Sequence, residues 1–158
     1  MKNIAVLVAL GLFVNVCQAD LPGVLHWKLQ QDLETTYKYI HNSLEESKLF
    51  VVFEPNIGKN LAGFSERWGE EYNRNDLQGI RSMVFCNGWY ANQISNLDPQ
   101  LLALCPLHIT LYRQNEMTHI VFVRPTHAGK GGAANALLQE LETTVSAAVE
   151  SGIEAASR

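Results

Sequence analysis

The run LHITLYRQNEMTHIVFVRP, residues 107–125, constrains the fold of this chain more than any other segment. Apolar and polar residues alternate on both sides of a polar turn near Gln114, Asn115 and Glu116. Alternation with a period of two is typical of a strand with one buried face, and two such runs around a short turn predict a β-hairpin. The strands of a hairpin are antiparallel, so an all-parallel sheet is excluded.

Strands and helices are expected to alternate along the rest of the chain. Strands are predicted where apolar residues alternate or form short β-branched and aromatic runs, at 25–29, 49–55 and 80–86. Helices are predicted where apolar residues recur every three or four positions, at 33–44, 57–68, 89–97 and 133–152, with a further turn after Asp98-Pro99. The continuous run 49–55 predicts a buried strand. This order predicts an α+β fold with a mostly antiparallel sheet and helices packed on one face.

The first 19 residues predict a secretory signal peptide. A lysine precedes a short apolar run, residues 4–14, and the small residue Ala19 follows at the expected cleavage position. The run is shorter than the roughly 20 residues that a membrane-spanning helix needs. We therefore expect cleavage near Ala19, a single domain over residues 20–158 that does not span a membrane, and a periplasmic or secreted location. Lipoprotein processing before Cys17 is the alternative.

The charge distribution argues against nucleic acid as a partner. The formal net charge is −4, and the 12 Lys and Arg residues are scattered along the chain. Nucleic-acid binding depends on grouped positive charge, so we expect no nucleic-acid partner. Hydrophobic residues make up 47% of the chain and charged residues 18%, which is the balance of a globular domain with its own core.

Cys86 and Cys105 are the two cysteines that remain after the predicted cleavage. In an oxidising compartment two remaining thiols are more often paired than free, so we name them as a disulfide candidate. Two free buried thiols are the alternative. A catalytic Cys86 would need a base oriented toward it, and no spacing in the sequence supplies one. No other catalytic signature is present, so the sequence names no catalytic residue and favours a non-enzymatic role.

His108, Tyr112 and His119 are the candidate ligand-binding residues. With a two-residue turn in the hairpin, all three project from one face of the sheet, together with Thr110. A solvated polar face accounts for this pattern, and a platform for a small ligand is the alternative. Histidine also binds metals and haem, which adds a further hypothesis. No HxH, HExxH or CxxCH spacing occurs, so covalent c-type haem is not expected and the cofactor stays undefined.

The middle of the chain carries a series of short motifs in a fixed order. Within residues 83–125 these motifs are Cys86-Asn87 at a strand end, Asp98-Pro99, Leu101-Leu102, Pro106, Tyr112 in the hairpin and Pro125 at its end. In order and spacing they resemble the domain of unknown function 302 family. Upstream, TYKYIHNSLEESKLFVVFE resembles the opening helix and strand of that family, so the resemblance covers residues 25–128.

The resemblance implies a compact α+β domain of the TATA-binding-protein-like class, often dimeric, with no activity assigned to the family at large. Three positions depart from the family pattern. Gly88 stands where the family often has Pro, Arg124 stands where it often has Asp, and Cys105 comes before Pro106 rather than after it. Any shared site built on those positions is in question for this chain.

Together these features predict a small exported binding or accessory protein, as a homodimer, that holds a ligand or partner on its sheet. The expected ligand residues are His108, Tyr112 and His119. The alternative is a periplasmic redox, metal-binding or haem-binding protein that uses His108 and His119 or the pair Cys86 and Cys105.

Overall fold

The computed structural model describes residues 21–158, so the predicted signal peptide lies outside the described residues. The strands are β1 (Val24–Leu29), β2 (Phe50–Phe53), β3 (Ile80–Cys86), β4 (Leu107–Gln114) and β5 (Met117–Val123). The helices are α1 (Leu33–Glu46), α2 (Ile57–Ala62), α3 (Ser65–Trp68), α4 (Gly88–Leu97), α5 (Pro125–Ala128) and α6 (Asn135–Ala156), with 3₁₀ helices η1 (Gly69–Glu71) and η2 (Pro99–Leu104). None of these helices is both long enough and apolar enough to cross a membrane.

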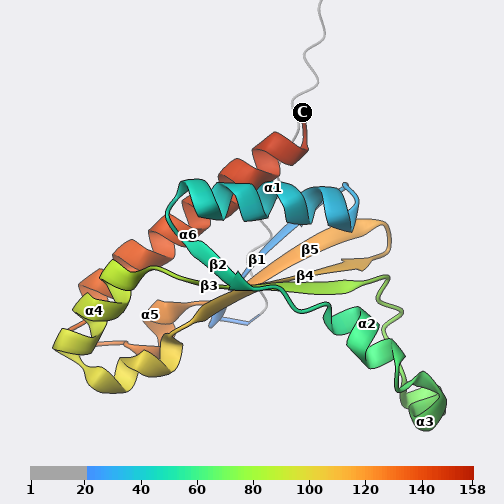
Figure 1. Ribbon diagram of the computed structural model, residues 1–158, viewed down its shortest axis with the longest axis horizontal. Coiled ribbons are helices and arrows are strands. Elements are labelled where there is room, and N and C mark those ends of the chain that lie inside the picture. The colour runs from blue at the N-terminus through green and yellow to red at the C-terminus, as the bar shows by residue number, and fades with distance from the viewer. Residues whose placement is uncertain (1–20) are drawn as a thin grey trace, which may run out of the picture.

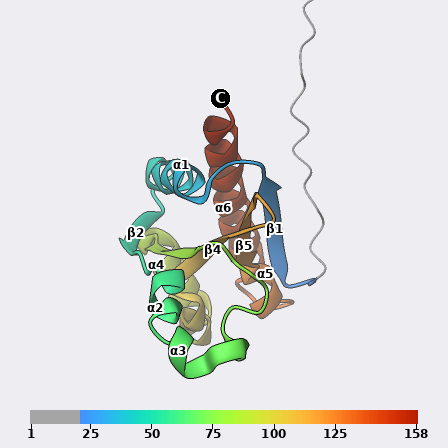
Figure 2. The same cartoon turned by 90° about the vertical axis from the view of Figure 1, so that its right-hand side faces the viewer.

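The strands form one antiparallel sheet in the order β1-β5-β4-β3-β2. Helices α1 and α6 pack against each other on one side of this sheet (Figure 1). In both views α2 and α3 lie on the side of the sheet away from α1 (Figures 1 and 2). The predicted α+β fold with an antiparallel sheet is confirmed: α1 and α6 pack on one face, while the short helices α2 and α3 lie on the other side.

The core lies between the sheet and the helices α1 and α6. Every second strand residue points into it, and the buried apolar strand residues are Trp27, Leu29, Met83, Phe85, Ile109, Leu111, Ile120 and Phe122. They pack with Ile40 and Leu44 of α1 and with Leu138, Val145 and Val149 of α6. Neighbouring residues in a strand point to opposite faces, so the side chains between these positions lie on the other side of the sheet.

Helices α1 and α6 approach each other closely at Ile40 and Gly152. A Cβ atom at position 152 would lie 2.8 Å from Ile40 Cδ1 and 2.9 Å from Ile40 Cα. A side chain can rotate away from such a contact, but the backbone of Ile40 cannot. Glycine at position 152 therefore allows the two helices to lie side by side over the sheet.

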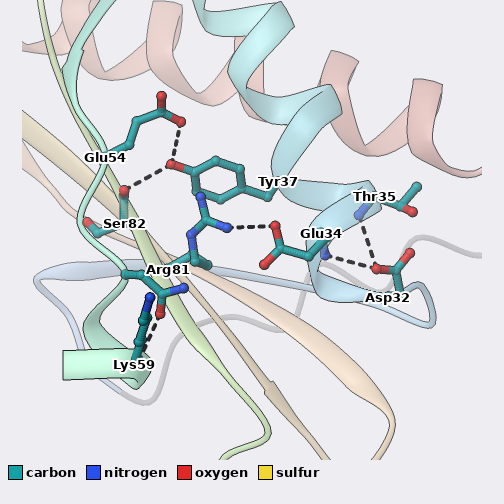
Figure 3. Close-up of polar contacts among 9 residues, drawn as sticks. Asp32, Glu34, Thr35, Tyr37, Glu54, Lys59, Arg81 and Ser82 are labelled. Atoms are coloured by element: carbon teal, nitrogen blue, oxygen red, sulfur yellow. Dashed lines mark hydrogen bonds and ion pairs between the residues drawn. The ribbon is translucent and has the colours of Figure 1, made fainter. Parts of the chain in front are cut away.

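A chain of polar contacts joins α1 to β3 and to the end of β2 (Figure 3). The Tyr37 hydroxyl lies 2.7 Å from Glu54 Oε2 and 3.1 Å from the carbonyl oxygen of Ser82. The Arg81 guanidinium lies 4.1 Å from the centre of the Tyr37 ring and donates to Glu34 Oε2 at 2.6 Å. Burial, reinforced by Glu54, raises the pKa of Tyr37, so the phenol stays neutral. These contacts fix α1 on the sheet.

The predicted β-hairpin is confirmed. Strands β4 and β5 are joined by Asn115 and Glu116, whose φ angles of 49° and 64° lie in the left-handed region. Two consecutive residues with positive φ form the tight turn that matches the twist of hairpin strands. The resulting register pairs Tyr112 directly with His119.

The prediction of a buried strand at 49–55 is wrong, because β2 is an edge strand. It pairs only with β3, and Phe50, Val52 and Phe53 remain 53%, 63% and 63% exposed. Val51 packs against the core, and its backbone N–H donates to Glu45 Oε1 at 2.6 Å. This carboxylate satisfies a backbone donor on the otherwise unpaired edge.

The single helix predicted over 57–68 is divided in the structure. Helix α2 ends before Gly63, and α3 begins at Ser65, and neither helix buries a residue in the core. Leu61 of α2 instead lines a groove together with Ile80 at the start of β3, as described below. The segment after Asp98 forms η2, which is a 3₁₀ helix capped by the Asp98 carboxylate.

Replacing Gly152 with Ala is expected to destabilise the protein by about 1–3 kcal/mol, because the added methyl group overlaps the Ile40 backbone and separates α1 from α6. Urea denaturation followed by circular dichroism measures the change in the free energy of unfolding. Ser151→Ala alters an exposed neighbour and serves as the control, with an expected change below about 0.5 kcal/mol. Equal stability of the two variants would contradict the close approach.

Candidate functional site

Strand side chains that alternate with the core residues point away from α1 and α6, and we call this side of the sheet the open face. Its most relevant residues are His26 and Lys28 of β1, Ile80 of β3, Tyr112 of β4 and His119 of β5. Residues paired across neighbouring strands share a face, so the register places these side chains together. Strands β1 and β3 and the two strands of the β4–β5 hairpin thus supply one surface.

Three rings lie together on the open face: two of them stack, and the third is hydrogen-bonded to that stack at its edge. The Tyr112 and His119 rings are nearly parallel, with centroids 4.6 Å apart and planes inclined by 9°. The His26 and His119 ring centroids lie 5.1 Å apart with their planes inclined by 26°, and His26 Nε2 lies 2.9 Å from His119 Nδ1, so these two rings meet edge to edge. At that distance one nitrogen donates to the other, so the two imidazoles share a single hydrogen bond. We call His26, Tyr112 and His119 the ring cluster.

A row of four directly paired residues crosses the open face through the ring cluster. Lys28 is paired with His119, His119 with Tyr112, and Tyr112 with Ile80. Strands lie about 4.8 Å apart, so this central row of Lys28, His119, Tyr112 and Ile80 spans about 14 Å. The row begins with a cation and ends with an aliphatic side chain.

A groove of about 330 Å³ lies at the Ile80 end of the central row. Its walls come from α2, α3, η1 and the loop before β3, and they include Leu61 and Trp68. Arg74 and Glu71 also line the groove and form an exposed ion pair of 3.2 Å with each other. Small-molecule pockets commonly have volumes of about 300–1,000 Å³, so the groove has room for part of a small ligand.

The rings of the central row are neutral at pH 7. Burial lowers the pKa of His119 from its ordinary value of 6.5, and the neighbouring His26 and Lys28 lower it further. Burial also raises the pKa of Tyr112. Both shifts favour the uncharged ring, because burial penalises the charged form. Lys28 then carries the positive charge of the row.

Of the three predicted ligand residues, the structure brings Tyr112 and His119 together and leaves His108 apart. His108 shares the open face, where it is paired with Val84, but it lies four residues from Tyr112 along β4. Four residues of extended chain correspond to about 13 Å. His108 is exposed and is not part of the ring cluster.

His26 takes the place beside His119 and was missed at the sequence level. The alternation of residues 25–29 indicates that His26 and Lys28 face away from the core. Their pairing with β5, however, joins residues 93 positions apart in the chain. No local pattern specifies which strand lies next to β1. The sequence therefore predicts on which face of the sheet His26 lies, but not which residue lies beside it.

Cys86 and Cys105 are not bonded to each other in this structure, but both line a small apolar cavity of about 10 Å³. Cys86 ends β3 and Cys105 follows η2, close to the directly paired residues Phe85 and Leu107. Burial raises the pKa of the Cys105 thiol, and Cys86 raises it further. A reactive cysteine needs a lowered pKa, so Cys105 suits a structural role.

Comparison with known proteins gives the family. The chain matches the profile described as Domain of unknown function DUF302 over residues 25–156. The chain belongs to this family. A solved structure described as an uncharacterized conserved protein DUF302 from Bacillus stearothermophilus superposes with a TM-score of 0.70 and 15% identity, covering 83% of this chain and 98% of that chain. At this identity the likeness shows the fold alone. No match was found among curated proteins.

One departure from the DUF302 pattern has a structural partner. Glu142 of α6 is buried, and its Oε1 accepts from Nε and Nη2 of Arg124 at 2.9 and 2.8 Å. Its Oε2 accepts from the Thr126 hydroxyl at 2.6 Å. Arg124 therefore joins the end of β5 to α6 and lies outside the ring cluster. Gly88, another departure, is the first residue of α4, which the Asn87 side chain caps.

The pKa of His119 in the folded protein is expected to lie below 6.5, and Lys28→Gln should raise it toward that value by removing a positive neighbour. NMR titration of the imidazole protons measures the pKa of His119 in the wild type and in the variant. In the unfolded chain this histidine has its ordinary pKa, so as pH falls through about 6.5 the unfolded state binds a proton before the folded state does. The free energy of unfolding should therefore decrease as pH falls through that value. Lys38→Gln, on the exposed side of α1, is the control. A wild-type pKa at or above 6.5 would refute the electrostatic description.

When the protein is expressed into an oxidising compartment, Cys86 and Cys105 are expected to be joined. Forming the bond removes two protons and two electrons, which a disulfide-exchange oxidant accepts. A crosslink closing a loop of this length stabilises a fold by roughly 3 kcal/mol when unstrained. Thiol counting on denatured, unreduced protein should find no free thiol, and finding two would rule the disulfide out.

Proposed function

We propose that this DUF302 protein is exported and holds a small ligand on its open face. The observation that carries the proposal is the ring cluster, in which Tyr112 stacks on His119 and His26 is hydrogen-bonded to His119, on the side of the sheet opposite α1 and α6. The proposed role is binding, because a sheet face fixed by its register presents these rings without a reactive nucleophile among them.

The ring cluster is positioned before any ligand arrives. Each ring stands on a different strand, and the strands are held by direct pairing on both sides of β5. The hydrogen bond between His26 and His119 fixes the ring orientations further. A site whose side chains are already ordered loses less conformational entropy on binding, which favours affinity. The adjoining groove supplies the concave surface that a flat sheet face lacks.

Export is supported by the layout of residues 1–19 and by the cysteine arrangement. The short apolar run after a lysine, with Ala19 at its end, is the layout of a cleaved signal peptide. Cys86 and Cys105 line the same small cavity, which is the proximity that a disulfide between them requires. The proposed location is the periplasm or the extracellular medium.

We propose that the working form is a homodimer that associates through β2. Phe50, Val52 and Phe53 are each more than half exposed on this edge strand, and we call them the β2 patch. Clustered exposed apolar side chains on a sheet edge favour association with another surface. A second copy of the chain presents the same patch, so a two-fold contact covers both at once.

A metal-binding or haem-binding role has weaker support. Within residues 21–158, no three His, Cys, Asp or Glu side chains are grouped so as to hold a metal ion. His26 and His119 are directed at each other, and a metal bound between them would have to displace their hydrogen bond. His108, the other predicted histidine, is too far along β4 to join them. These contacts favour ligand binding over a metal or haem role.

Native mass spectrometry of the protein purified from the exported fraction tests the proposal. We expect a chain that starts near residue 20, a mass of two subunits, and a retained small molecule that leaves on denaturation. Tyr112→Ala should lose the retained molecule but keep the dimer, because it removes the ring that stacks on His119. Phe53→Asp should give a monomer, because it places a charge in the β2 patch.

Gln139→Glu is the control for the added charge, since Gln139 is exposed on α6, far from β2 in the sequence. It should leave the dimer and the ligand in place. A chain that retains its first 19 residues would refute export. A wild-type monomer would refute the dimer, and equal ligand retention by wild type and Tyr112→Ala would refute binding on the open face.

A further inference from the structure

Resting on the proposed function, we infer that the ligand of the open face is an anion with a flat, largely apolar body. Its charged group lies at Lys28 and its body lies along Tyr112 and Ile80 toward the groove. Three independent observations support this class of ligand: the charges on the open face, the ring geometry, and the position of the groove.

The open face carries positive charge and no carboxylate. Reading the strand register from β1 to β2, no residue on this face within the described strands is Asp or Glu. The face carries the cation Lys28 and three histidines, His26, His108 and His119, and a neutral imidazole ring can donate its N–H to an anion. This contrasts with the whole chain, whose formal net charge is −4. An anion meets attraction here, and a cation meets none.

Lys28 is available to bind an anion. It is half-buried at the first position of the central row, and within residues 21–158 it forms no salt bridge. An ammonium group on a flexible stem can donate up to three hydrogen bonds to a carboxylate, phosphate or sulfonate. Its position beside His119 directs the charged group of the ligand to the β1 end of the row.

The ring geometry favours a flat body. The planes of Tyr112 and His119 are inclined by only 9°, so the cluster presents parallel aromatic surfaces. Aromatic groups prefer stacked or edge contacts at centroid distances of about 4.5–7 Å, and another planar group extends such a stack at low cost. Tyr112 is half-buried and leaves part of its ring open to a ligand.

The position of the groove determines how the ligand is oriented along the central row. Leu61, Trp68 and Ile80 give its walls apolar character at the end of the row opposite to Lys28. Tyr112 and Lys28 are separated by two strand steps, or about 10 Å, which matches a small amphipathic molecule. A charged head at Lys28 therefore places the apolar body over Tyr112 and toward the groove.

Two dyes that differ by one sulfonate test this inference. The anion 8-anilino-1-naphthalenesulfonate and its uncharged counterpart N-phenyl-1-naphthylamine are titrated into the mature protein, with binding followed by dye fluorescence. We expect the anion to bind with one site per chain and at least about fivefold more tightly, the size of one exposed charge-assisted contact. Lys28→Gln should remove this preference, weakening the anion about fivefold and the neutral dye less than twofold.

Matched variants locate the binding site of the two dyes on the protein. Lys38→Gln makes the same change on α1 and should leave both affinities unchanged. Tyr112→Ala and Leu61→Trp should weaken both dyes, because the first removes the flat surface and the second narrows the groove. Circular dichroism confirms that each variant is folded.

The outcomes separate this inference from the proposed function. Suppose that the two dyes bind with equal affinity, that Tyr112→Ala weakens both, and that Lys28→Gln changes neither affinity. The anionic ligand is then refuted, and binding on the open face stands. If binding of neither dye depends on Tyr112, both the anionic ligand and the open-face site are refuted. If Leu61→Trp changes neither affinity, the placement of the apolar body in the groove is refuted.

Discussion

The close approach of α1 and α6 at Ile40 and Gly152 is the constraint on which the rest of the structure depends. Both helices must cover the same side of a five-stranded sheet, and a side chain at position 152 would keep them apart. With the two helices side by side, the apolar strand residues on that side are buried in one core. The alternation of the strands then commits the intervening side chains to the opposite side.

The candidate site is a consequence of this one-sided burial. Stability comes from the helix-covered side, so the open face is free to carry polar rings and a lysine that a core would not tolerate. Strand pairing fixes those rings relative to each other as firmly as a core would. Backbone register places His26, His119 and Tyr112 side by side, and the hydrogen bond between the two histidines orients their rings.

The parts of the fold that depend on local chemistry could be predicted from the sequence. The hairpin followed from period-two alternation around Asn115-Glu116, and the shared face of Tyr112 and His119 followed from the length of that turn. The residues at which α1 begins and the cap at Asp98 also reflect short-range interactions. These features are encoded within a few residues, so a single sequence is sufficient to read them.

The parts that depend on distant contacts could not be predicted. His26 joins the ring cluster because β1 pairs with β5, and no segment between them specifies that choice. From a continuous apolar run such as 49–55 alone, a buried strand cannot be told from an edge strand whose apolar side chains are exposed to solvent. The groove likewise needs α2, α3 and the start of β3 to meet, which local spacing does not encode.

The most direct test of the central claim, that the central row of the open face is a binding surface, is an amide chemical-shift map of the isotope-labelled protein with and without 8-anilino-1-naphthalenesulfonate. The largest changes should fall on β1, β4 and β5 around Lys28, Tyr112 and His119 and extend to Ile80. Changes confined to the β2 patch or to the exposed Trp89 of α4, with the central row unaffected, would contradict it.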